Sequence, residues 1–123
     1  MQKLQFESAW EKTIAPKDRQ QISDIFHSCA TSLNTSVHFS FLWEAENHKN
    51  ELLVTALIHN YNDTSSQINN AVITYQMKQE KLATGIFNVQ PIIPANTSMP
   101  WTFIFSSQNE TTHAPHYTII KTL

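Results

Sequence analysis

The chain has 123 residues with 8 basic and 10 acidic side chains, a formal charge of −2, so it lacks the positive field that draws proteins to nucleic acid or anionic lipid. The single cysteine excludes an internal disulfide and multi-cysteine metal sites, and the single glycine excludes a Gly-rich phosphate loop. No apolar run reaches the roughly 20 residues of a membrane span, so we expect no membrane insertion. The start of the chain has no apolar core of a signal peptide, so we expect a cytoplasmic protein, with one domain over residues 1–123.

The first predicted element is an amphipathic helix over about 16–30. Pro16 suits the first helical position, where its missing N–H costs nothing. The N-cap would be Ala15, or Thr13 if the helix begins earlier. The apolar residues recur at the i, i+3, i+4 and i+7 spacing of one helical face: Ile22, Ile25, Phe26 and Cys29. We interpret Cys29 as a small apolar member of this buried face rather than as a reactive thiol.

After residue 36 the pattern changes to a period of two. The stretch 37–45 alternates between an apolar face, which includes Trp43, and a more polar face, and this predicts a strand with one buried side. A turn at 47–50 leads to 52–59, which is apolar on both faces. A strand of that kind belongs in the middle of a sheet.

The remaining predicted strands are 70–77, 82–89, 101–105 and 116–121. A turn at 78–81 would join the first two as a hairpin, and Pro91 and Pro94 would block regular pairing until residue 101. One helix followed by about six strands predicts a mainly β fold, a small antiparallel immunoglobulin-like β-sandwich with the helix at one edge or face. The alternative is an α+β fold with a single open antiparallel sheet.

Residue types with catalytic or metal-binding chemistry form no recognisable site. No pair of histidines has the i, i+4 spacing of a helical metal site, and His113 and His116, three apart, would need a further ligand from elsewhere. No serine has the flanking glycines of a nucleophile elbow. We therefore expect no metal, no organic cofactor and no enzymatic activity; a small enzyme of unrecognised type is the less favoured alternative.

Aromatic residues and methionine supply the candidate partner-binding side chains. Trp43 is predicted to be a core residue of the sandwich. Trp10 and Trp101 stand in less regular surroundings, where each could pin a segment to the core or serve as a binding anchor. Met99 lies beside Trp101 and could form one apolar contact with it. We name Trp10, Met99 and Trp101 as candidate partner-binding residues, with a core position as the alternative for Met99.

Three stretches of the chain resemble the SLAP domain family: 9–19, 52–60 and 93–105. The resemblance covers about residues 6–105 and leaves the tail 106–123 outside. This family belongs to small proteins associated with S-layer assembly and the accessory Sec system of Gram-positive bacilli. A single copy without a signal peptide looks most like the shorter of two such proteins.

The resemblance implies a non-enzymatic cytoplasmic factor that helps the accessory Sec translocase ATPase export S-layer proteins by protein–protein interaction. The implied partners are S-layer proteins, the translocase ATPase, the longer SLAP-domain protein, or a second copy of the chain. A cell-surface domain that binds wall polymer is the alternative. The family supplies no catalytic residue to carry over.

Overall fold

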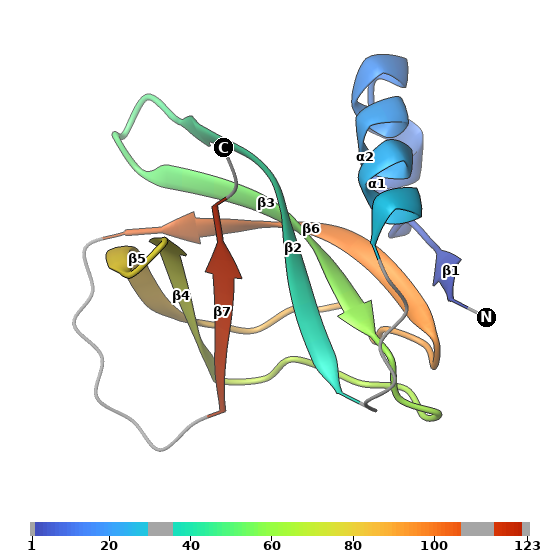
Figure 1. The fold of residues 1–123 in the computed structure, drawn as a ribbon. Helices are drawn as coiled ribbons and strands as arrows, with labels where there is room; N and C mark the ends of the chain where they lie inside the picture. Colours follow the sequence, from blue (N-terminus) through green and yellow to red (C-terminus); the bar gives the residue numbers. More distant parts are fainter. Residues whose placement is uncertain (1, 30–35, 107–114, 122–123) are drawn as a thin grey trace.

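The computed structural model describes residues 2–29, 36–106 and 115–121 (Figure 1). Its elements are β1 (Lys3–Leu4), α1 (Ser8–Thr13), α2 (Pro16–Ser28), β2 (Val37–Glu46), β3 (Leu52–Asn60), β4 (Ala71–Met77), β5 (Glu80–Phe87), β6 (Thr97–Phe105) and β7 (His116–Ile120). The strands form two sheets, ordered β1-β6-β3-β2 and β5-β4-β7. The predicted mainly β sandwich is confirmed, and the alternative single open sheet is not the arrangement found.

The molecule has three layers, because the helices cover one face of the four-stranded sheet and the three-stranded sheet packs against the other (Figure 1). The helix layer is centred on buried Ile22, Leu42 and Leu57. The larger core lies between the sheets and contains buried side chains from β3, β4, β6 and β7. Each face of the four-stranded sheet therefore has its own apolar cluster.

The helical region differs from the prediction in one element. Helix α2 begins at Pro16 as predicted, with Ala15 as an N-cap that makes no side-chain hydrogen bond. The short helix α1 was not predicted, and Trp10 lies in it rather than in an irregular segment. Its N-cap is Glu7, whose carboxylate accepts from the Ala9 N–H at 3.0 Å. Six residues are too few to show a helical period, and glutamate is not among the usual N-cap residues.

Strand β3 lies in the middle of its sheet, as its two apolar faces predicted. It pairs with β2 on one side and with β6 on the other. Val54, Ala56 and Ile58 face the core between the sheets, whereas Leu57 faces the helices. The continuous apolar run is thus explained by burial on both faces.

Strand β2 contains a bulge, after which the side chains point to the opposite faces from those that strict alternation predicts. Phe41 pairs with Ala56 but Trp43 pairs with Thr55, so Leu42 is the extra residue. Trp43 consequently packs against the helix cluster. The prediction that it is a core residue of the sandwich was wrong, because a shift of one residue moves every later side chain to the opposite face.

Two strand pairs are parallel, in contrast to the predicted antiparallel arrangement: β1 with β6 and β4 with β7. A parallel pair needs a long connection, and β7 is reached only after the chain has completed the other sheet. Strand β6 begins at Thr97, four residues before the predicted start, and includes Pro100. Strand β1 pairs with β6 at Thr97 and Ser98. The edge of β6 beyond Ser98 therefore has no β1 partner, and Pro100, which lacks an N–H, can be accommodated there.

Beyond the bulge, Glu44 connects the two sheets. The buried Tyr75 hydroxyl of β4 donates a hydrogen bond to Glu44 Oε1, and Lys121 Nζ lies 2.9 Å from the same oxygen. The Tyr75 hydrogen bond first, and then the Lys121 contact, lower the pKa of Glu44 below 4.5. Burial, and then the hydrogen bond to Glu44, raise the pKa of Tyr75.

We expect Tyr75→Phe to destabilise the protein by roughly 1.5–3 kcal/mol, because the carboxylate loses a charge-assisted hydrogen bond. A depressed carboxyl pKa contributes stability above the unfolded value, and this contribution is lost as pH falls through the folded pKa. The variant should therefore lose less stability below pH 4.5 than the parent. Urea unfolding at several pH values measures both effects; equal stability at neutral pH would contradict the role given to this hydroxyl.

Candidate protein-binding site

A groove of about 890 Å³ opens beside the N-terminal segment, between α1, α2 and the loop that precedes β6. Its apolar lining comes from Leu4, Phe6, Pro91 and Ile92, with Met99 at its floor. The polar lining residues are Gln5, Glu7, Ser8, Glu11, Arg19 and Ser23. We call this site the N-terminal groove. Its mixed lining is typical of a surface that receives a polypeptide segment.

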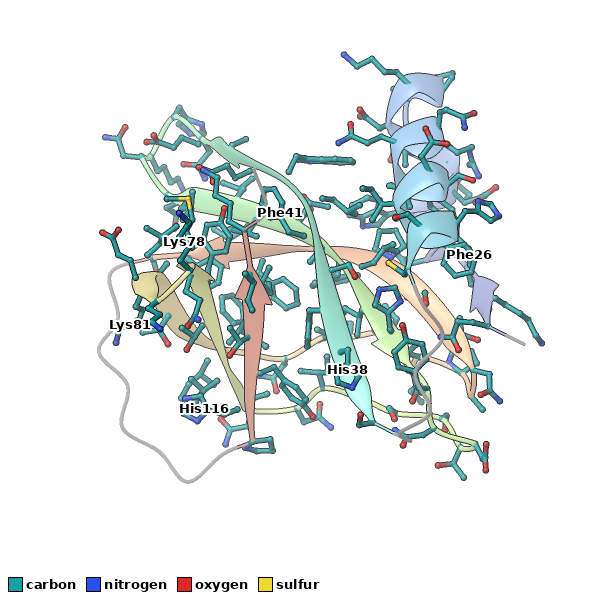
Figure 2. All side chains as sticks on the ribbon, in the orientation of Figure 1. Phe26, His38, Phe41, Lys78, Lys81 and His116 are labelled. Atoms are coloured by element: carbon teal, nitrogen blue, oxygen red, sulfur yellow. The ribbon has the colours of Figure 1, made fainter. Side chains whose placement is uncertain are left out.

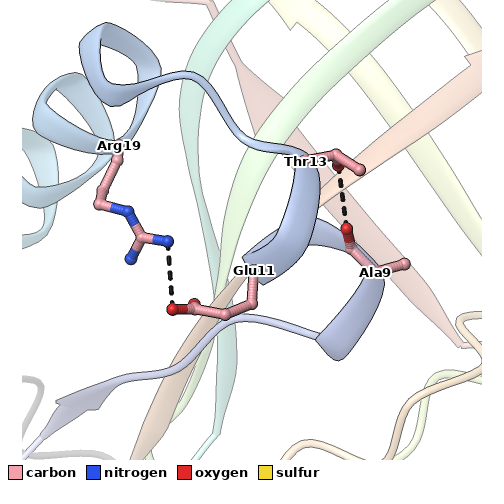
Figure 3. A network of polar contacts seen from close by, with 4 residues as sticks. All are labelled: Ala9, Glu11, Thr13 and Arg19. Atoms are coloured by element: carbon pink, nitrogen blue, oxygen red, sulfur yellow. Dashed lines mark hydrogen bonds and ion pairs between the residues drawn. The ribbon is translucent and has the colours of Figure 1, made fainter.

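Arg19 organises one wall of the N-terminal groove. Its guanidinium lies 3.1 Å from Glu11 Oε1 and stacks over the Phe6 ring, with Cζ 4.7 Å from the ring centroid. Figure 3 shows the ion pair, together with the Thr13 hydroxyl that donates to the Ala9 carbonyl at 2.9 Å. Because both charged side chains are about half exposed, the pair contributes little stability and mainly orients α1 against α2.

The structure does not bring the three candidate residues into one patch. Trp10 is half-buried against the helix cluster, whereas Trp101 is half-buried against the core between the sheets. Met99 is only 2% exposed and belongs to the same core. The proposed exposed contact of Met99 with a partner is corrected to a core position, because β6 begins before it and turns its side chain inward. Roles for Trp10 and Trp101 in partner binding stay predictions.

Ile92 is an exposed apolar residue of this groove that was not among the named candidate partner-binding residues. Its side chain is 58% exposed, the largest value among the exposed large apolar residues of the described chain. It follows Pro91 in a segment without a regular strand. The available signal was an apolar residue between two prolines, outside any helical or strand period.

A second groove, of about 640 Å³, lies between the first half of β5, the β2–β3 turn and the ends of β3 and β6. We call it the β5 groove. It is lined by residues of β5, of the β2–β3 turn, and of the ends of β3 and β6: Lys49, Asn50, Glu51, Leu52, Lys81, Leu82, Ala83, Thr84, Phe105 and Ser106. Lys81 and neighbouring Lys78 stand at the end of the β4–β5 hairpin remote from the helices (Figure 2).

A buried polar network lies beneath the helices and centres on His59. Its Nδ1 is 2.6 Å from Ser98 Oγ and its Nε2 is 2.8 Å from Ser40 Oγ. Gln2 Nε2 donates to Ser98 Oγ at 3.1 Å, and Ser40 Oγ lies 3.3 Å from the Cys29 sulfur. The network thereby joins the N-terminal segment, three strands and the end of α2.

One set of proton positions satisfies the whole network. If Ser98 accepts from Gln2 and donates to Nδ1 of His59, the imidazole is neutral and its Nε2–H donates to Ser40. Burial, and then the nearby His38, lower the pKa of His59 from 6.5 to about 4. The imidazole therefore positions the strands under the helices in its neutral form.

The histidines, carboxylates and cysteine that the structure describes form no metal-binding cluster. Over residues 2–29, 36–106 and 115–121, no group of three or more His, Cys, Asp or Glu side chains could hold a metal ion. His113, half of the His113–His116 pair, lies outside the described residues. In the same described ranges, neither helix is long and apolar enough to cross a bilayer.

Comparison with known families gives one match. The sequence profile of the SLAP domain, designated Sec_acc_SLAP, matches residues 4–121. The match extends past residue 105, where the resemblance seen in the sequence stopped, and it includes β7. No curated protein and no solved structure matches the chain significantly.

Proposed function

This chain belongs to the SLAP domain family, and from that membership we propose that it is a non-enzymatic accessory factor of Sec-dependent export that acts by protein–protein interaction. The observation that carries the proposal is the match over residues 4–121 to a family designated for an accessory Sec role. Almost the whole fold, from β1 to β7, falls within the match. The proposal therefore concerns the complete sandwich and not one short motif.

The geometry supports a binding role through the two grooves. Both are open and lined by apolar and charged side chains in mixture, as surfaces that receive polypeptide usually are. The N-terminal groove exposes Ile92, and the β5 groove exposes Leu82 to 40%. Burial of these side chains by a partner would contribute roughly 25 cal/mol per Å² of apolar surface removed from water.

The finer proposal names the partners and the place. We place the protein in the cytoplasm, where it would hold S-layer proteins or the accessory translocase ATPase, alone or with the longer SLAP-domain protein. In this role it resembles the short S-layer assembly protein of the family.

Deletion of the gene in its own host tests this function. We expect S-layer protein to accumulate inside the cells and to fall several-fold at the surface, while a general Sec client is exported normally. Cell fractionation should recover the protein itself in the cytoplasm, and capture with the tagged full chain should enrich the translocase ATPase or an S-layer protein. Normal S-layer export in the deletion strain would refute the proposal. Recovery at the cell surface would favour the wall-polymer alternative.

A further inference from the structure

We propose that the outer edge of β5 binds an extended acidic segment of a client polypeptide by strand addition. This inference rests on the proposed function and identifies the chemistry of the segment that would be recognised. It uses the backbone of β5, the apolar side chains of the β5 groove and its two lysines.

Among the described strands, β5 is paired along one edge only. Strand β5 has eight residues and pairs with β4 along one side. Within the described part of the chain, no strand pairs along its other side. An open edge presents rows of N–H and C=O groups that an extended peptide can satisfy, and this main-chain pairing supplies affinity for many sequences.

The other sheet edges are less suited to an added strand. Strand β1 has only two residues. Strands β2 and β7 lie beside each other at the closed side of the sandwich (Figure 1). Strand β2, with ten residues, is also an edge strand of its sheet, but it packs along β7; the edge of β5, with eight residues, borders the β5 groove.

The β5 groove adds side-chain contacts to the backbone edge. Register places Tyr75 opposite Ala83 but Gln76 opposite Lys81, so Leu82 is the extra residue of a bulge. Leu82 is 40% exposed and lines the groove, whereas Phe105, which also lines it, is 4% exposed. An added strand could therefore cover Leu82, near the beginning of β5.

The charge of the β5 groove favours a carboxylate on the added segment. Lys49 and Lys81 both line the groove, and neither forms an ion pair within the part of the chain that the structure describes. The lining carboxylate, Glu51, already accepts a hydrogen bond from Asn47 Nδ2 at 2.9 Å. Two lysines and one carboxylate leave the groove with one net positive charge, which complements an acidic peptide. A second copy of this chain that paired through its own β5 would bring the same positive charge to the groove, so it fits less well.

The first test uses backbone-modified peptides. A fluorescein-labelled peptide of alternating valine and threonine, about as long as β5 and ending in an aspartate pair, should bind the full chain in fluorescence anisotropy. N-methylation of alternate residues removes the donors of one peptide edge only. Two peptides are compared, one N-methylated at the odd and one at the even positions. We expect one of them to bind at least about tenfold more weakly and the other to bind like the parent peptide, because only one edge of the added strand faces β5. Equal binding of the two N-methylated peptides, or no binding of the parent peptide, would overturn the inference.

The second test uses the two lysines. The double variant Lys49→Gln/Lys81→Gln should weaken binding of the aspartate peptide by roughly tenfold. It should leave the weaker binding of a peptide that ends in lysines unchanged or improve it. Lys17→Gln, an exposed lysine of α2, is the matched control and should have no effect. The inference fails if the control and the double variant behave alike, or if sedimentation shows a dimer that the peptide dissociates, since a second copy would then occupy β5.

Export assays separate this inference from the proposed function. If deletion blocks S-layer export and the Lys49→Gln/Lys81→Gln variant restores it fully, the β5 site is wrong and the accessory role stands. If deletion leaves export normal, the accessory role fails even where the purified protein binds the peptide. If export requires the protein and also requires Lys49 and Lys81, the result supports both the accessory role and the β5 site.

Discussion

Met99→Asp should destabilise the protein by more than about 3 kcal/mol, because it places a carboxylate in the core between the two sheets without a partner. Met99 is 2% exposed, and its register partner Ile58 is fully buried. Chemical denaturation followed by circular dichroism measures the loss. If the variant does not fold, Met99→Ala should still fold and lose about 2–5 kcal/mol.

Two controls separate burial from partner contact. Met99→Leu conserves volume and should cost less than about 1.5 kcal/mol. Ile92→Asp changes a side chain of the same N-terminal groove that is 58% exposed, and should change stability by no more than about 0.5 kcal/mol. Wild-type stability of Met99→Asp together with weakened partner capture would contradict the core position and restore Met99 as a surface contact.

Acidification from pH 7.5 to pH 5 should destabilise the protein by about 2 kcal/mol through His59 alone. The pKa of His59 is about 4 when folded against 6.5 ordinarily, so the unfolded chain binds the additional proton first. Stability is therefore lost as pH falls below 6.5, and the loss approaches about 3 kcal/mol near pH 4. Glu44 acts in a lower window, because its pKa lies below 4.5.

Urea unfolding at half-unit pH steps measures this dependence. His59→Asn should be less stable at pH 7.5, since Ser40 and Ser98 lose the imidazole between them. It should also lose most of the slope between pH 7.5 and pH 5. His48→Asn, in an exposed turn, should retain the slope of the parent. A slope that persists unchanged in His59→Asn would show that another group titrates in this window.

The elements that the sequence predicted well are those whose burial is regular along the chain. Helix α2 keeps one apolar face against the four-stranded sheet, so its spacing and Pro16 identify it. Strand β3 is buried on both faces, and its unbroken apolar run predicted a central position. The β4–β5 hairpin was predicted as well, but β5 begins at Glu80, two residues before the predicted start of that strand. The family resemblance also arose from local stretches and is confirmed by the match.

The sequence pattern gave a wrong prediction, or none, where a single residue or a distant contact decides which face a side chain occupies or whether a helix forms. The bulge at Leu42 depends on how β2 pairs with β3, and it directs Trp43 to the helices and Glu44 to Tyr75. The short helix α1 is too brief to show a period and is oriented through Arg19.

Sequence by itself therefore determined the fold class, the main helix, the central strand and the family, because these depend on local propensity and on periodic burial. Only the tertiary structure decided the candidate sites. It placed Met99 in the core, paired β7 with β4, and left one edge of β5 without a strand partner among the described residues, beside Lys49 and Lys81. Those features depend on which segments meet in space, and a period along one segment does not contain that information.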